Sequence, residues 1–157
     1  MDKSANAIRA MNYNEGELEQ LTTFLRVIDD IFPIPLSNKV SIDEYALKTL
    51  SKGVALCAED SGKNVGILLG YANDSVTKNA YIGTLGVLEE YRSQGIGKSL
   101  VNYMKELSHS YGMEMIYLFT HKSNGSAVRF YIKNGFTIVL PPSTERPDEV
   151  CLVAHLE

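Results

Sequence analysis

The chain has 157 residues, of which 45% are apolar and 22% are charged, and its formal net charge at pH 7 is −4. This length suits one domain, spanning residues 1–157, whose core needs no disulfide or metal to be stable. The negative charge argues against a nucleic-acid-binding protein, which needs a basic face to neutralise phosphates. Since no apolar run approaches the length of a membrane span, we expect neither nucleic acid nor a membrane as a partner.

The cysteines and histidines indicate a reduced protein without a metal site. Cys57 and Cys151 lie in apolar, strand-like runs, where a free thiol behaves as a small apolar side chain. The three histidines are scattered, and no group of Cys and His has the spacing of metal ligands. The first residues, MDKSANAIRAMNYNEG, lack the apolar core of a signal peptide. These features predict a cytoplasmic protein that binds no metal.

The N-terminal part of the chain predicts a short strand followed by two helices. The strand is expected over residues 6–11, NAIRAM. Residues 15–30 carry apolar side chains at helical spacing, and the prolines of FPIPLS then break the chain. A second helix is expected over 41–53, SIDEYALKTLSKG, with Ser41 as its N-cap and Gly53 at its end.

The hydrophobic pattern then changes from helical to strand-like. VALCAED (54–60) and VGILLGYAND (65–74) read as two strands, and the turn DSGKN (60–64) between them predicts a hairpin. After a polar loop, AYIGTLGVL (80–88) reads as a further strand. The middle of the chain therefore predicts three strands in succession.

The C-terminal half alternates helices and strands. A long helix is expected over 95–111 and a buried strand over 115–121. A short helix is expected within 123–136, capped by Ser123 or Asn124 and stopped by Gly135. FTIVL (136–140) and EVCLVAHL (149–156) predict a final antiparallel pair joined by PPSTERPD. The whole order predicts an α+β, or mixed α/β, fold, in which the strand–helix–strand unit makes one right-handed parallel crossover.

The stretch YRSQGIGKSLVNYM (91–104) places a glycine-rich turn before an amphipathic helix, an arrangement that typically binds an anion. It is not a Walker A loop, because Arg92 stands where the first glycine of that motif is required. It is not a Rossmann fingerprint, because Leu100 occupies the place of the third glycine. A third pattern, R/Q-x-x-G-x-G/A, is satisfied by Arg92, Gly95 and Gly97.

With these residues, VLEEYRSQGIGKSLV resembles the acyl-CoA-binding motif of the GNAT superfamily, the GCN5-related N-acetyltransferases. A second segment, NGSAVRFYIKNGF (124–136), resembles the other half of that signature, N-x-x-A-x-x-F-Y-x-x-x-G-F. The two segments lie at the family spacing, with one strand between them, and the element order agrees from residue 6 to 156. The resemblance implies a GNAT-like, mostly antiparallel sheet that is splayed between its fourth and fifth strands and has helices on both faces.

The resemblance also implies acetyl-CoA as the co-substrate, without a metal. Leu85, Gly86 and Val87 would bind the pantetheine arm through their backbone groups. The N–H groups of the glycine turn suit a pyrophosphate, and the glycines let the backbone approach it closely. The residues expected around the pyrophosphate are Arg92, Ser93, Gln94, Gly95, Ile96, Gly97, Lys98 and Ser99.

Two of the expected cofactor-binding residues have a second interpretation. The side chain of Arg92 could instead form a surface ion pair with Glu89 or Glu90. Asn124 could serve only as the N-cap of its helix, although the resemblance also gives it a hydrogen bond to the pantetheine region. For Asn124 the two roles are compatible, and we expect both.

Tyr131 is the expected general acid, because the resemblance places its hydroxyl near the thioester sulfur. A phenol with its ordinary pKa of about 10 is protonated at neutral pH, so it can donate a proton to the departing thiolate. The general base is less defined by the sequence. His121, which titrates near neutral pH, is the named candidate, Asp74 and Tyr81 are weaker ones, and a chain of water molecules is an equal alternative.

The acceptor pocket is expected to come from three variable segments, residues 32–39, 73–78 and 141–148. Their mixed polarity predicts a small polar amine as the acceptor, bound by a monomer or a homodimer. The resemblance implies N-acetyl transfer by direct attack of the amine in a ternary complex. Two alternatives stay open: O-acyl transfer to a sugar-like hydroxyl, and a regulatory module that binds acyl-CoA without catalysis.

Overall fold

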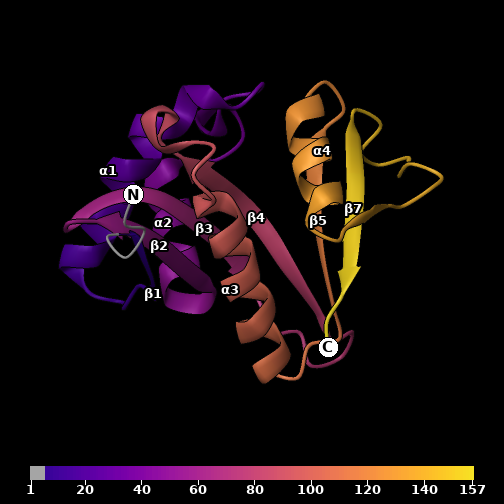
Figure 1. Ribbon diagram of the computed structural model, residues 1–157, viewed down its shortest axis with the longest axis horizontal. Coiled ribbons are helices and arrows are strands. Elements are labelled where there is room, and N and C mark those ends of the chain that lie inside the picture. The colour runs from indigo at the N-terminus through magenta and orange to yellow at the C-terminus, as the bar shows by residue number, and fades with distance from the viewer. Residues whose placement is uncertain (1–5) are drawn as a thin grey trace.

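The computed structural model describes residues 6–157 and contains one sheet with helices on both of its faces (Figure 1). The strand order is β1-β2-β3-β4-β5-β7-β6. The strands are β1 (Asn6–Ala10), β2 (Val54–Asp60), β3 (Lys63–Tyr71), β4 (Asn79–Val87), β5 (Met115–His121), β6 (Thr137–Ile138) and β7 (Glu149–His155). The α-helices are α1 (Glu15–Ile28), α2 (Ile42–Lys52), α3 (Ile96–Ser110) and α4 (Gly125–Lys133).

The sheet confirms the predicted mixture of pairings. Neighbouring strands are antiparallel except β4 and β5, which are parallel and are joined through α3. The predicted N-caps of α2 and α4 also form: Ser41 accepts a hydrogen bond from the N–H of Glu44, and Asn124, not Ser123, accepts one from the N–H of Ala127. Within the described residues, none of the helices is both long and apolar enough to cross a membrane.

The sheet opens between β4 and β5, as the resemblance implied. The two strands pair only where Asn79–Ile82 lies beside Met115–Leu118, and beyond that point they diverge in a V (Figure 1). The pairing of β3 with β4 skips Gly83, since Leu69 faces Thr84 and Gly70 faces Ile82. This β-bulge bends β4 where its contact with β5 ends, so the cleft begins at Gly83.

An apolar cluster fills each face of the sheet. Alternate side chains of β3 point to opposite faces, so that Ile67 packs with α1 and α2 whereas Leu68 packs with α3. Both clusters contain fully buried large side chains, among them Leu21 and Leu25 of α1, and Leu100 and Met104 of α3. The helical apolar faces expected from the sequence are therefore core faces, and they fix the helices against the strands that border the cleft.

Three predicted boundaries differ from the structure. The hairpin turn takes only Ser61 and Gly62, so β3 begins at Lys63 and also ends earlier than expected. The first helix, expected over 15–30, ends at Ile28 and is followed by a 3-10 turn over Asp29–Ile31. The expected strand 136–140 shrinks to Thr137–Ile138, because the two prolines that follow it have no N–H for a further ladder bond.

Candidate active site

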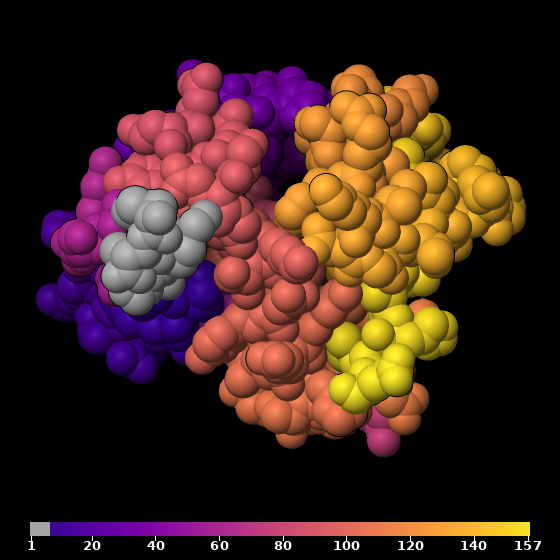
Figure 2. Space-filling model, in the orientation of Figure 1, coloured from indigo at the N-terminus to yellow at the C-terminus, as the bar shows by residue number. Residues whose placement is uncertain are grey.

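The cleft between β4 and β5 holds two adjoining cavities, and a groove extends from the second one. We call them the turn cavity, the inner pocket and the outer groove, with volumes of about 490, 130 and 760 Å³. Figure 2 shows the cleft as a recess between the surface of β4 and α3 and the orange surface of β5 and α4. Phe32, Leu85, Asn124, Ala127 and Tyr131 line both the turn cavity and the inner pocket, so these two cavities meet at Tyr131 and Asn124.

The turn cavity gathers most of the residues expected to bind the cofactor. Those that line it are Leu85, Gly86, Val87, Arg92, Ser93, Gly95, Ile96, Gly97, Lys98, Asn124 and Tyr131. Two expected residues do not line it: Gln94, whose side-chain amide donates to the Glu90 carbonyl at 3.3 Å, and Ser99. Nine of the others lie on β4, on the turn or at the start of α3, on one side of the cleft, whereas Asn124 and Tyr131 face them from α4 and its N-cap on the other side.

The glycines shape the floor of the turn cavity. Gly95 precedes α3 with φ of +86°, a left-handed conformation that strains other residues. A Cβ at Gly97 would lie 3.3 Å from Cζ of Phe130 on α4, so a side chain there would crowd the opposite wall. No side chain caps α3, which leaves the N–H groups of its first turn free to bind an anion.

Arg92 does not form the surface ion pair that the sequence allowed. Its Nε donates to the carbonyl of Val87 at 3.2 Å, and no described acidic residue lies within ion-pair distance of it. This hydrogen bond ties the turn to the end of β4. The exposed guanidinium remains available at the edge of the turn cavity.

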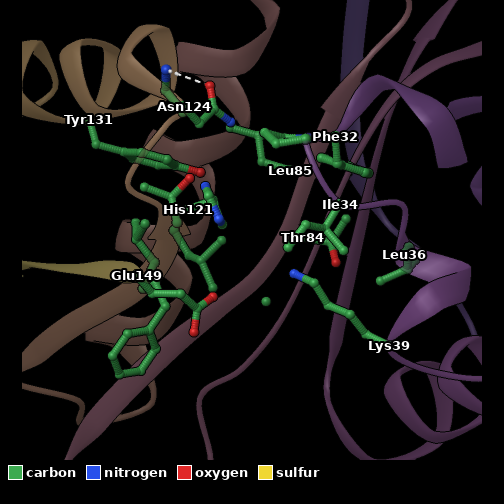
Figure 3. Close-up of a pocket in the computed structure, with 17 residues that line it drawn as sticks. Phe32, Ile34, Leu36, Lys39, Thr84, Leu85, His121, Asn124, Tyr131 and Glu149 are labelled. Carbon is green, nitrogen blue, oxygen red and sulfur yellow. Dashed lines mark hydrogen bonds between the residues drawn. The ribbon is translucent and has the colours of Figure 1, made fainter. Parts of the chain in front are cut away.

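Tyr131 lies at the junction of the turn cavity and the inner pocket and is only 6% exposed. Its ring packs edge-on against Phe130 and Phe136, with centroid distances of 5.1 and 5.3 Å. Burial raises the pKa of its phenol above the ordinary value, and within residues 6–157 the hydroxyl makes no hydrogen bond. The structure thus holds a protonated hydroxyl, directed into the inner pocket near His121 (Figure 3).

His121 ends β5 and lines both the inner pocket and the outer groove. Its Nδ1 accepts a hydrogen bond from the backbone N–H of Ser123 at 3.1 Å and lies 2.7 Å from the Ser123 hydroxyl. Because a backbone N–H can only donate, these bonds assign the proton of the neutral imidazole to Nε2. His121 in this arrangement is a donor toward the pocket, and accepting a proton requires it to release Ser123.

Glu149 is a pocket residue that sequence reasoning missed. It begins β7, stands opposite His121 in the antiparallel register, and lines the inner pocket and the outer groove. Its carboxylate accepts from the Arg146 guanidinium at 2.7 Å, and that guanidinium lies 4.2 Å from the centroid of the Phe119 ring. No local pattern in the sequence points to Glu149, since only strand pairing brings it beside His121.

A second polar pair lies on the other side of the cleft, where Thr84 lines the inner pocket and Tyr45 lines the outer groove. The hydroxyls of Tyr45 on α2 and Thr84 on β4 are 2.7 Å apart. Burial raises the pKa of Tyr45 to about 12, so this phenol also stays protonated at neutral pH. Thr84 is buried directly after the bulge at Gly83, and the hydrogen bond therefore fixes the strand where the cleft begins.

The weaker base candidates are less well placed. Tyr81 lines only the outer groove, where its ring packs against Tyr117 with centroids 5.0 Å apart. Asp74 lines neither the inner pocket nor the outer groove, and its carboxylate accepts from the N–H groups of Val76 and Thr77. Hydrogen bonding to Thr77 lowers the pKa of Asp74, so this carboxylate stabilises its own loop.

Two of the three segments expected at the acceptor site do line the outer groove. They contribute Ile34, Leu36, Lys39, Glu145, Arg146, Pro147 and Asp148. The third segment, residues 73–78, lines neither the groove nor the inner pocket; the expectation for it was wrong, because its hydrogen bonds to Asp74 fold it on itself. Within residues 6–157, no cluster of three or more His, Cys, Asp or Glu could hold a metal ion.

Comparison with known proteins gives consistent similarities. The model of the Acetyltransferase (GNAT) family matches residues 21–136. The chain is 32% identical to N-alpha-acetyltransferase 50 of Danio rerio, and this match covers 69% of the chain and 64% of that protein. It is 30% identical to N-alpha-acetyltransferase 20 of Dictyostelium discoideum, and this match covers 75% of the chain and 75% of that protein. The match thus spans slightly less than two thirds of the Danio protein.

Solved structures of N-acetyltransferases have a similar fold. PaiA N-acetyltransferase from Thermoplasma acidophilum, in complex with coenzyme A, superimposes with a TM-score of 0.73 at 18% identity. The superposition covers 96% of this chain and 98% of that one. At this identity the likeness concerns the fold, and it extends over both sides of the cleft.

Proposed function

Because the chain belongs to the GNAT acetyltransferase family, we propose that it transfers an acetyl group from acetyl-CoA to a primary amine of a small polar acceptor. The observation that carries the proposal is the meeting of two cavities at Tyr131. One cavity offers free N–H groups at a helix N-terminus. The other is lined by both apolar and polar side chains and opens into a groove. An acyl donor and an acceptor could therefore approach one another at the same protonated hydroxyl.

The turn cavity suits the pyrophosphate and pantetheine of acetyl-CoA. The uncapped start of α3 supplies N–H groups for an anion, and Arg92 and Lys98 border the same cavity. The absence of a side chain at Gly97 keeps space open in front of Phe130. Leu85, Gly86 and Val87 lie on the part of β4 that has no partner strand on the cleft side. Their backbone groups on that side are available to the pantetheine arm, except the Val87 carbonyl, which accepts from Arg92.

The acid step follows from the position and protonation of Tyr131. The acceptor nitrogen attacks the thioester carbonyl carbon, the new C–N bond forms, and the C–S bond breaks. The departing sulfur takes a proton from the Tyr131 hydroxyl, and the proton that the nitrogen loses as the amide forms restores that hydroxyl. A phenol whose pKa is raised by burial keeps this proton throughout the neutral range, and no protein acceptor competes for it within residues 6–157.

The base step uses the wall formed by His121 and Glu149. The acceptor ammonium must lose a proton before it attacks, and both side chains line the inner pocket. His121 accepts the proton once Ser123 releases Nδ1, whereas the Glu149 carboxylate needs no such change. Replacing His121 by Gln, and separately Glu149 by Gln, distinguishes them: loss of the acidic limb of the kcat/KM profile on pH identifies the base.

A second acceptor class is a polypeptide N-terminus. It is favoured by the names of the two similar proteins, both N-alpha-acetyltransferases, and by the open outer groove of about 760 Å³. The α-amine of a peptide would use the same chemistry, so the two classes differ only in what occupies the groove.

The test is an acceptor screen in which acetyl-CoA is mixed with the purified chain and thiol release is followed. Small polar amines, amino acids, short peptides and sugars form the panel, and mass spectrometry identifies the acetylated product. We expect release with an amine, giving a product stable to mild hydroxylamine. A product cleaved by hydroxylamine would indicate an ester. CoA binding without thiol release from any acceptor would contradict catalysis.

A further inference from the structure

Two oppositely charged side chains border the inner pocket on opposite walls. Lys39 follows the 3-10 turn Leu36–Asn38, and Glu149 begins β7. Both line the inner pocket and the outer groove. Figure 3 shows the Lys39 ammonium directed across the pocket toward the wall that carries His121 and Glu149. A molecule passing from the groove to Tyr131 therefore passes between a cation and an anion.

Lys39 is not committed to another partner. Among the ion pairs of residues 6–157, none includes Lys39. It does not line the turn cavity, so it is not placed to bind the phosphates of acetyl-CoA. Its backbone is nevertheless anchored, because its N–H donates to the carbonyl of Leu36 at 2.9 Å. The result is an exposed cation, carried by an anchored backbone, at the mouth of the acceptor pocket.

Most of the remaining charges of the groove are paired; the exception is Glu145, which forms no ion pair within residues 6–157. Arg146 is paired with Glu149 at 2.7 Å, and Asp148 with Lys122 at 3.3 Å. This groove therefore lacks the strong excess of negative charge that would attract a polycation. The Lys39 ammonium would repel an acceptor ammonium that came close to it, whereas it would attract an anionic group on the same molecule.

We propose that the acceptor amine carries a carboxylate, as an amino acid does, and that Lys39 binds this carboxylate while the amine faces His121 and Glu149 beside Tyr131. This inference rests on the proposed function and specifies its substrate class. The ammonium of Lys39 would donate a charge-assisted hydrogen bond to the acceptor. Lys39 is then a residue that determines specificity, because it contacts the acceptor away from the reacting atoms.

The test compares acceptors that differ only in that charge. The probes are an equimolar mixture of the proteinogenic amino acids and the matching mixture of their carboxamides, followed by the individual pairs that react. Thiol release gives kcat/KM for the wild type, for Lys39→Met and Lys39→Glu, and for the control Lys48→Met, which changes an exposed lysine of α2 outside the cavities. The measured quantity is the ratio of carboxylate to carboxamide activity in each variant relative to wild type, because intrinsic differences in amine reactivity cancel.

We expect Lys39→Met to lower this ratio about 10-fold, the effect of losing one hydrogen bond to a charged group, with CoA-induced thermal stabilisation unchanged. Lys39→Glu should lower it further, and Lys48→Met should leave it as in wild type. An unchanged ratio in Lys39→Met, with both acceptor forms slowed equally or not at all, would overturn the inference and leave the proposed function intact. The inference would also be overturned, and the proposed function kept, if peptide amides were the only amines that react. If none of the amines tested supports thiol release, both the inference and the proposed function are overturned.

Discussion

Replacing Tyr131 by Phe removes one hydroxyl from the junction of the turn cavity and the inner pocket. The ring keeps its edge-on contacts with Phe130 and Phe136, at centroid distances of 5.1 and 5.3 Å. Since the hydroxyl makes no hydrogen bond within residues 6–157, no folded-state partner loses its bond. We expect the free energy of unfolding to change by less than about 1 kcal/mol, so any large kinetic effect concerns the reaction.

The expected kinetic effect follows from the role of the proton. General-acid assistance is typically worth about 100- to 10,000-fold, but a thiolate leaves comparatively easily without help. We therefore expect kcat to fall by roughly 10- to 100-fold, which corresponds to about 1.4–2.7 kcal/mol of transition-state stabilisation. The affinity for CoA should change little, because the lost interaction is made only in the transition state.

Steady-state thiol release at saturating acetyl-CoA and acceptor measures this change, and thermal unfolding with and without CoA measures binding. Tyr103→Phe is a matched control, because Tyr103 packs against the same apolar cluster but lines none of the cavities. Single-turnover kinetics must show that chemistry limits the rate. If it does, and kcat of Tyr131→Phe equals that of the wild type, Tyr131 is not the acid.

Four further outcomes are expected. CoA should raise the melting temperature, because a ligand bound only by the native state stabilises it, and ATP should raise it much less; equal shifts would contradict the assignment of the turn. Gly97→Glu should abolish the CoA shift, because its side chain would occupy the space before Phe130, while circular dichroism stays native; a retained shift would mean that this glycine serves only the turn. Asn124→Ala should lower stability by about 1 kcal/mol through loss of the helix cap, and Asn124→Asp should restore stability but not CoA affinity if the amide also binds pantetheine. Burial raises the pKa of Tyr45 from about 10 to about 12, so its contribution to the free energy of unfolding is fully present below pH 10 and is lost between pH 10 and 12, by about 2–3 kcal/mol. In Tyr45→Phe, alkaline unfolding titrations should show a shallower decline of that free energy, together with a loss of about 1–2 kcal/mol at neutral pH from the unpaired Thr84 hydroxyl.

Local sequence patterns determined most of the elements. The helical spacing of apolar residues, the caps at Ser41 and Asn124, and the glycine turn before α3 all depend on residues within a few positions of one another, so they can be read along the chain. The same holds for the two motifs that resemble the GNAT signature, because each is confined to one strand–helix or helix–strand segment. The family and the fold were predictable for this reason.

Long-range pairing decided the rest. Glu149 lies beside His121 only because β7 pairs with β5, and Lys39 faces them only because the segment between α1 and α2 packs over the opposite side of the cleft. The tautomer of His121 depends on where the backbone N–H of Ser123 points, which no residue pattern encodes. The sequence alone thus determined the family and the turn that can bind an acyl donor, whereas the charges that meet an acceptor were decided by the tertiary structure, because they come from segments far apart in the chain that only the splayed sheet brings together.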